Sequence, residues 1–167
     1  ILISLGTLHW KFGEKSKELG RDRCEDYEQS VDYFTQAVDR DRLHPQLDRD
    51  VAYTYRTRGQ VIWLLNKHRC FGRDRVEVLK EAVDSYSEAI QLDSEEAFYW
   101  HMRGRLCYSI WNILQERLGD RDPRMVDWLL RGLDDTERAL ELDPVDDVNR
   151  DYRPNAFKEH FLFALFR

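Results

Sequence analysis

The stretch Gly20-Arg21-Asp22-Arg23-Cys24-Glu25 recurs further along the chain as Gly72-Arg73-Asp74-Arg75-Val76-Glu77. A degenerate third copy reads Gly119-Asp120-Arg121-Asp122-Pro123. Glycine just beyond a helix can take the left-handed conformation that ends it, and aspartate followed three residues later by glutamate caps the next helix. In the third copy, Asp122 caps and proline takes the first helical position, which it tolerates well. Each copy therefore predicts a helix end, a tight turn and a new helix start.

Similar helices are predicted after the three turns, over residues 27–39, 78–93 and 125–143. Each contains two small residues seven positions apart with a larger residue between them, and this spacing places all three on one helix face. The three sets are Ser30, Phe34 and Ala37; Ala82, Tyr86 and Ala89; and Gly132, Thr136 and Ala139. The helix before each turn carries a glycine of its own, Gly6, Gly59 or Gly104. Because a glycine inside a helix costs about 1 kcal/mol relative to alanine, these positions predict close helix crossings.

Together these features resemble the tetratricopeptide repeat. In two copies an aromatic residue, Tyr55 or Trp100, stands four positions before the glycine, and Leu2 takes this place in the first copy. The ending Ala139-Leu140-Glu141-Leu142-Asp143-Pro144 closely reproduces that of the family. The copies here are about 50 residues apart, whereas the family's unit has 34 residues. We therefore expect repeats with lengthened first helices, and the alternative is a generic helical bundle.

The resemblance implies an all-α fold, a right-handed superhelical array of three antiparallel helical hairpins with a C-terminal capping helix. We expect a single domain over residues 1–167, with repeats at about 1–41, 50–93 and 94–144 and the capping helix at about 154–167. The last segment could instead begin a further repeat. Because the chain starts at Ile1 rather than at Met, we expect it to be a fragment of a longer protein.

The resemblance also implies a function, because the first helices of such hairpins line a concave groove that holds a peptide or a partner segment. Carried over by position, the partner-binding residues are Trp10, Tyr53, Arg56, Gln60, Trp63, Phe98, His101, Arg105 and Tyr108. Spacings of three and four independently place residues 53–63 on one stripe and residues 98–108 on another. Arginine can hold a carboxylate with two hydrogen bonds, and aromatic residues dominate many interfaces. We therefore expect a protein-interaction scaffold whose partner is acidic and apolar.

Two alternatives remain open at this point. Some of the aromatic residues, Tyr53 and Trp63 above all, could belong to the core because longer helices pack along more of their length. The chain could also serve a structural or self-association role within a larger multidomain protein, with the concave surface or the C-terminal helix as the contact.

Other classes of function are disfavoured. The sequence contains no HExxH, GxSxG, P-loop or GxGxxG motif, so we expect no enzyme activity, no metal site and no cofactor. A formal net charge of -6 argues against binding to nucleic acid or to an anionic membrane. The chain has no apolar run of about 18 residues. The three cysteines form no CxxC pair, so we expect reduced thiols in a cytoplasmic protein.

Overall fold

The computed structural model describes residues 1–42, 48–70, 72–118, 123–144, 158–159, 161–162 and 164. Within these ranges the chain is all-α, as predicted, and no strand is present. The elements are α1 (Leu2–Glu14), α2 (Ser16–Leu19), α3 (Arg23–Arg42), α4 (Asp48–His68), α5 (Arg75–Leu92), α6 (Ala97–Leu118) and α7 (Pro123–Leu142).

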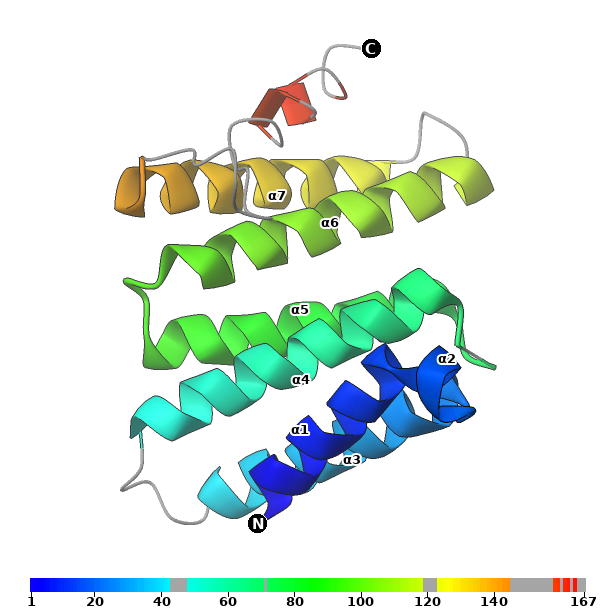
Figure 1. Cartoon of the computed structure of the whole chain (residues 1–167). Helices are drawn as coiled ribbons and strands as arrows, with labels where there is room; N and C mark the ends of the chain where they lie inside the picture. Colours follow the sequence, from blue (N-terminus) through cyan, green and yellow to red (C-terminus); the bar gives the residue numbers. More distant parts are fainter. Residues whose placement is uncertain are drawn as a thin grey trace. The chain divides into compact units, whose positions relative to one another are not determined.

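The long helices pack as sequential antiparallel pairs, α1 with α3, α4 with α5, and α6 with α7 (Figure 1). They fall into two compact units, a first unit at Ile1–Leu92 and a second unit at Asp93–Arg167. In the first unit α3 also packs against α4. The three predicted hairpins are therefore present, and a continuous superhelical array stays a prediction.

The first predicted turn ends one helix and starts the next by the expected chemistry, and the second predicted turn starts its helix in the same way. Gly20 follows α2 with a φ of 62°, the left-handed conformation that favours glycine. Asp22 then accepts a hydrogen bond of 2.8 Å from the backbone N–H of Cys24. Asp74 likewise accepts bonds of 2.9 Å and 3.3 Å from the N–H groups of Val76 and Glu77. These caps explain why α3 and α5 begin some residues before the predicted helix starts.

The end of α4 differs from the prediction. Arg69, not Gly72, takes the left-handed conformation, with a φ of 57°. The N–H of Arg69 bonds to the carbonyl of Asn66, and that of Cys70 bonds to the carbonyl of Leu65, both at 3.1 Å. This is the Schellman pattern. The helix α4 therefore ends at His68, before Gly72 is reached. In the third copy α7 begins at Pro123 as predicted, and Gly119 and Asp122 lie outside the described residues.

The glycines inside the first helices of the hairpins pack against the larger residues inside the second helices. A Cβ atom placed on Gly6 would lie 3.0 Å from the ring of Phe34, and one on Gly59 would lie 2.8 Å from the ring of Tyr86. A Cβ on Gly104 would lie 3.0 Å from the hydroxyl of Thr136. The predicted close crossings are confirmed in all three hairpins.

Replacing Gly59 with alanine should therefore destabilise the first unit, although alanine favours a helix by about 1 kcal/mol over glycine. The ring of Tyr86 is fully buried, and overpacking of this kind costs about 1–3 kcal/mol. The difference between these two terms is a net loss of up to about 2 kcal/mol in the free energy of unfolding, measured by urea denaturation.

Gly72→Ala is the matched control, because an added Cβ there meets nothing within 4 Å. We expect this change to stay within about 0.5 kcal/mol. In a Tyr86→Leu background, Gly59→Ala should lower the free energy of unfolding by much less than it does in the wild type. An increase in stability from Gly59→Ala alone would contradict the close crossing.

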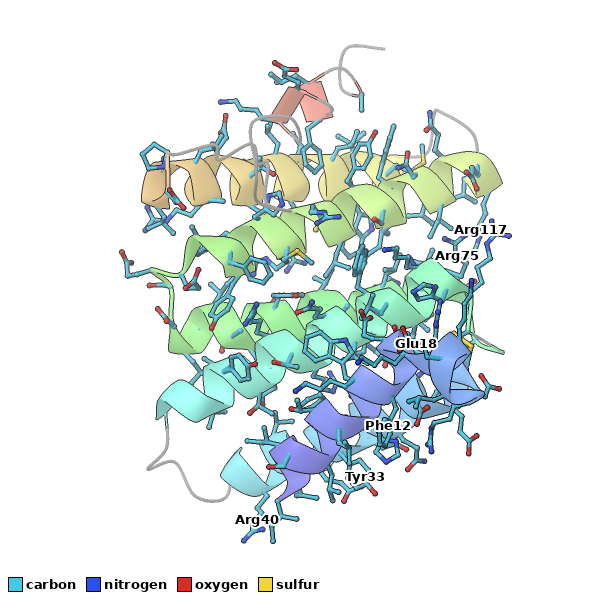
Figure 2. The ribbon with its side chains drawn as sticks, in the orientation of Figure 1. Phe12, Glu18, Tyr33, Arg40, Arg75 and Arg117 are labelled. Carbon is cyan, nitrogen blue, oxygen red and sulfur yellow. A yellow bond between two sulfur atoms is a disulfide. The ribbon has the colours of Figure 1, made fainter. Side chains whose placement is uncertain are left out.

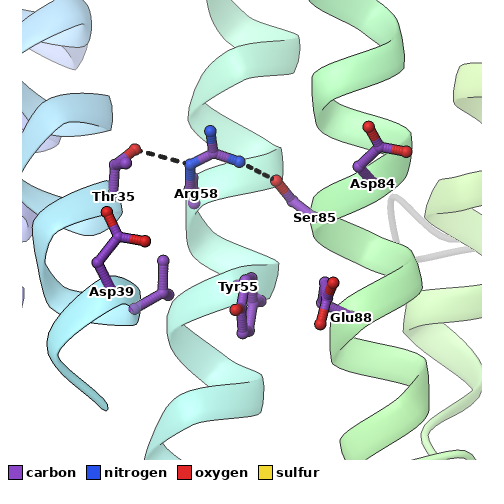
Figure 3. A pocket seen from close by; sticks show the side chains of 8 residues that line it. Thr35, Asp39, Tyr55, Arg58, Asp84, Ser85 and Glu88 are labelled. Carbon is purple, nitrogen blue, oxygen red and sulfur yellow. Dashed lines mark hydrogen bonds between the residues drawn. The ribbon is translucent and has the colours of Figure 1, made fainter. Parts of the chain in front are cut away.

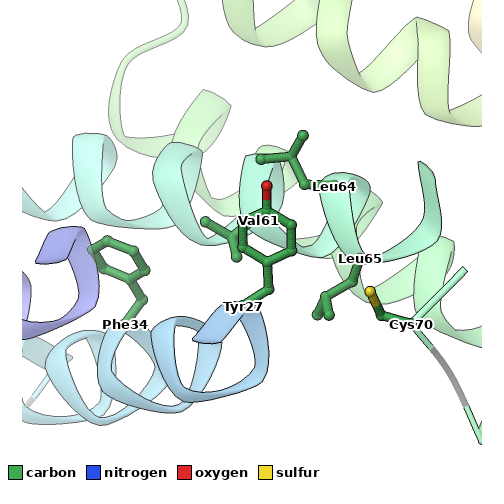
Figure 4. Close-up of a cluster of buried hydrophobic side chains, with 6 residues drawn as sticks. All are labelled: Tyr27, Phe34, Val61, Leu64, Leu65 and Cys70. Carbon is green, nitrogen blue, oxygen red and sulfur yellow. The ribbon is translucent and has the colours of Figure 1, made fainter. Parts of the chain in front are cut away.

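Each unit has a core of its own. In the first unit Tyr27, Phe34, Val61, Leu64, Leu65 and Cys70 form a buried cluster contributed by α3, by α4 and by the residue Cys70 that follows α4 (Figure 4). In the second unit Trp111, Met125, Leu129 and Phe161 form another. Phe161 is 0% exposed and comes from the segment predicted to cap the array. This contact agrees with a covering role, and most of residues 154–167 lies outside the described residues.

Candidate functional site

The predicted stripe on α4 reaches the surface over part of its length. Tyr53 is 46% exposed, and Arg56, Gln60 and Trp63 are partly exposed. The guanidinium carbon of Arg56 lies 5.4 Å from the centre of the Tyr53 ring. Such a separation is typical of a cation–π contact. The N-terminal half of the stripe therefore offers an aromatic ring and a cation on one accessible face.

The two tryptophans of the predicted set contribute to the core of the first unit. Trp10 and Trp63 are partly buried and pack against the cluster around Tyr27 and Phe34. The ammonium of Lys67 lies 5.2 Å from the centre of the Trp63 ring. The core alternative for Trp63 is thus supported, and only the outer edges of these two side chains can meet a partner.

The predicted stripe on α6 belongs to the second unit and is less accessible. Tyr108 packs edge-on against Phe161, with ring centres 5.3 Å apart. Phe98 and Arg105 are partly exposed, and Arg105 donates to the sulfur of Met102 at 3.8 Å. On α6, Phe98 and Arg105 therefore remain the most suitable residues for a partner contact.

His101 is the predicted site residue that the structure places furthest from this role. Its side chain is 1% exposed. Burial, and to a lesser extent the positive charge of Arg105, lowers the pKa of His101 to about 3. At neutral pH His101 is therefore an uncharged, enclosed side chain that is not available to a partner in this conformation. Helical spacing placed it on the stripe, but spacing does not reveal what covers a face.

A pocket centred on Arg58 was not predicted from the sequence. It is a cavity of about 180 Å³ between α3, α4 and α5, lined by Thr35, Val38, Asp39, Tyr55, Arg58, Asp84, Ser85 and Glu88 (Figure 3). Arg58 donates to the hydroxyls of Thr35 at 2.8 Å and of Ser85 at 2.6 Å. Burial lowers the pKa of its guanidinium. Among the described residues Arg58 makes no ion pair.

The internal repeat shows what an arginine at this position can bind. Arg58 and Arg103 both stand immediately before a marker glycine. In the second unit Arg103 holds Asp135 with two hydrogen bonds, at 2.9 Å and 2.6 Å. In the first unit the corresponding residue is Ser85, a hydroxyl in place of the carboxylate. The recurring Arg-Gly pair was a signal in the sequence, but its partner became clear only in the structure. Asp39, Asp84 and Glu88 also line the pocket of Arg58. The pocket therefore suits a ligand that carries both a positive and a negative group better than a simple anion.

The cysteines differ from the prediction of reduced thiols. Cys24 and Cys70 form a disulfide, drawn in Figure 2, that joins the first turn of α3 to the last residue of the Schellman turn. The start of α3 and the end of α4 lie close together because these two helices pack against each other. This packing brings together two cysteines separated by 46 positions in the sequence. Arg75, labelled in the same figure, donates to Asn66 at 3.0 Å and ties the start of α5 to this end of α4. Cys107 stays a free thiol, and burial raises its pKa to about 12.

The described residues hold no group of three or more His, Cys, Asp or Glu side chains arranged to bind a metal ion. No helix within the described ranges has the length and apolar character needed to cross a membrane. Comparison with protein-family models finds no match to the chain, and comparison with curated proteins finds no significant relative. The tetratricopeptide resemblance therefore rests on the sequence motifs and on the hairpins that they form.

Proposed function

We propose that this chain is a protein-interaction module of tetratricopeptide type, and that α4 holds part of the surface that binds a partner segment. The observation that carries the proposal is the contact between the exposed Tyr53 and the partly exposed Arg56, in which a cation lies over an aromatic ring. Neither side chain belongs to the buried clusters of the two units. Arginine and tyrosine are the residue types that most often supply large shares of interface energy.

The chemistry of this pair suggests the partner. Arg56 can hold a carboxylate, and the ring of Tyr53 offers a rigid apolar face to an aliphatic or aromatic side chain. A peptide segment with acidic and apolar residues, in extended or helical form, would meet both. A structural role within a larger protein is the second candidate, and Phe98 and Arg105 would then serve a neighbouring domain.

The disulfide also bears on the cellular compartment of the chain. Disulfides persist mainly in oxidising compartments and are rare in the cytosol. The Cys24–Cys70 bond therefore argues against the cytoplasmic location expected from the cysteine count, unless the bond is formed and broken reversibly.

The proposal can be tested with a random peptide library displayed on phage and selected on the purified chain. We expect the selected peptides to be enriched in Asp or Glu beside apolar residues. Binding to the variant Tyr53→Ala plus Arg56→Glu should fall by at least about tenfold, which corresponds to about 1.4 kcal/mol. Fluorescence anisotropy titrations with a synthetic copy of the most enriched peptide measure the dissociation constants of the wild type and of the variant.

Arg40→Glu is the matched control, because it makes the same charge reversal at an exposed position of α3. It should leave the affinity within about twofold, a change of less than about 0.5 kcal/mol. Circular dichroism should show equal helix content in all variants. Peptides that bind the double variant as tightly as the wild type, or a selection that returns basic peptides, would contradict the proposal.

A further inference from the structure

The disulfide of the first unit lies in the wall of a second cavity. This cavity has a volume of about 340 Å³ and is lined by Ser16, Lys17, Arg21, Asp22, Arg23, Cys24, His68 and Cys70. It is formed by α2, the turn that follows it, the start of α3 and the end of α4. Three of its side chains are Lys or Arg in a chain whose formal net charge is -6.

The positive charges of this cavity are not all balanced. Arg21 is paired with the buried Asp26 through bonds of 2.8 Å and 2.6 Å. This pairing holds the pKa of the Asp26 carboxyl below its ordinary value. Lys17 is exposed and makes no ion pair among the described residues. The one carboxylate of the lining, Asp22, is engaged as the cap of α3.

Arg23 is held in place by neutral groups. Its Nε donates to the carbonyl of Gly13 at 3.2 Å and to the hydroxyl of Ser16 at 3.0 Å. One terminal nitrogen, Nη1, lies 3.0 Å from Nδ1 of His68. Burial and the charge of Arg23 lower the pKa of His68, which favours the uncharged imidazole at neutral pH. In the tautomer that carries its proton on Nε2, Nδ1 accepts this bond from Arg23. Among the described residues, the charge of Arg23 is thus positioned in the lining without a direct ion pair to a carboxylate.

The two cysteine residues differ in exposure. Cys24 is partly exposed, whereas Cys70 is 6% exposed and belongs to the core cluster of the first unit. We therefore expect a small thiol that enters the cavity to reach Cys24 before Cys70. The nearby charges of Lys17 and Arg23 would attract a thiol that carries carboxylates.

We propose that Cys24 is a modification site, at which a small anionic thiol of the glutathione type binds in this cavity and forms a mixed disulfide. The incoming thiolate attacks the sulfur of Cys24 and forms the new S–S bond. The bond between Cys24 and Cys70 breaks, and its electron pair leaves on the sulfur of Cys70, which takes a proton from water. The small thiol is the reductant, and one molecule of it is consumed in each step. Lys17 and Arg23 hold its carboxylates.

The test compares two probe thiols of opposite charge, glutathione and cysteamine, on the full chain under native conditions. Iodoacetamide traps the released Cys70 thiol, and mass spectrometry locates the mixed disulfide. Rate constants are expressed per thiolate, because only the thiolate attacks. We expect glutathione to react several-fold faster than cysteamine at low salt, with the mixed disulfide on Cys24. Salt should shrink this ratio, because it screens exposed charges.

Lys17→Glu is the variant that tests the cavity, since Lys17 is exposed and its replacement leaves the fold intact. Reversing one charge at about 7 Å in water should lower the ratio by roughly sevenfold for each unit of charge by which the two thiols differ. Lys17→Arg should preserve the ratio, and Lys11→Glu on α1, outside the lining, is the matched control. Equal rates for the two thiols, a ratio unchanged by Lys17→Glu, or a mixed disulfide on Cys70 would each overturn the proposal.

Discussion

Replacing Arg103 with methionine should lower the free energy of unfolding of the second unit by about 3–5 kcal/mol. Arg103 and Asp135 form a bidentate ion pair between α6 and α7, with side chains 13% and 3% exposed. Methionine retains much of the length of the side chain but removes the charge. The Asp135 carboxylate would then be buried without its counter-ion, which is the costly situation for a charge in a protein interior. Urea denaturation followed by circular dichroism measures the loss.

The pH dependence of this variant provides a second readout. Burial already raises the pKa of Asp135, and the hydrogen bonds from Arg103 oppose the rise. Without Arg103 the folded-state pKa should rise further above the unfolded value. A carboxyl group of this kind is bound to a proton in the folded state at a pH where the unfolded state has lost it. Its stabilising contribution is present below the unfolded pKa and is lost as the pH rises through the folded pKa. Arg103→Met should therefore be less destabilising in mild acid than at neutral pH.

Two controls separate a buried charge from simple loss of contact. Arg103→Met combined with Asp135→Leu removes both charges, and such replacements are often neutral or stabilising. Arg138→Met breaks a pair with Glu141 at 3.0 Å whose members are 40% and 66% exposed. We expect that change to cost less than about 1 kcal/mol. A single Arg103→Met variant as stable as wild type would show that Asp135 is solvated.

Loss of the Cys24–Cys70 disulfide should have the next largest effect. The bond closes a loop of 46 positions, and the chain-entropy relation for a loop of this length gives about 4 kcal/mol. We expect Cys24→Ser combined with Cys70→Ser to destabilise the first unit by about 2–4 kcal/mol. The start of α3 and the end of α4 should lose most protection in hydrogen exchange, because the bond joins these two helix ends.

Reduction of the wild type provides the matching experiment without a mutation. Dithiothreitol should lower the urea midpoint of the wild type toward that of the double serine variant and should leave the variant unchanged. The free Cys107 is buried and present in both proteins, so it cannot account for the difference. A wild-type midpoint that is the same with and without reductant would show that the bond does not stabilise the fold.

Local signals in the sequence predicted the helices well. Capping by Asp22 and Asp74 and the left-handed Gly20 depend on residues within a few positions of one another, so a short stretch contains the whole interaction. The contact between Gly59 and Tyr86 was also foreseeable, because the same small and large residues recur in each hairpin. The recurrence of this pattern in three hairpins therefore predicted a contact between residues that are distant in the sequence.

The candidate site was predicted less completely. The 3.6-residue period places Tyr53, Arg56 and Trp63 on one face, but the period does not say whether the core or solvent covers that face. Tyr53 proved exposed, Trp63 packs on the core, and His101 is enclosed. Arg58 lies on another face of α4, and its pocket exists only because Thr35 and Ser85 arrive from two other helices.

By itself, then, the sequence determined which residues cap α3 and α5, how the helices pair into hairpins, and which glycines lie at their crossings. The tertiary structure alone decided that Cys24 meets Cys70 and that Arg103 and Arg58 have different partners. The physical reason is the range of the interactions. Caps, turns and helix faces are set by neighbours in the chain, whereas burial, ion pairing and disulfide formation depend on which distant helix is packed against each face.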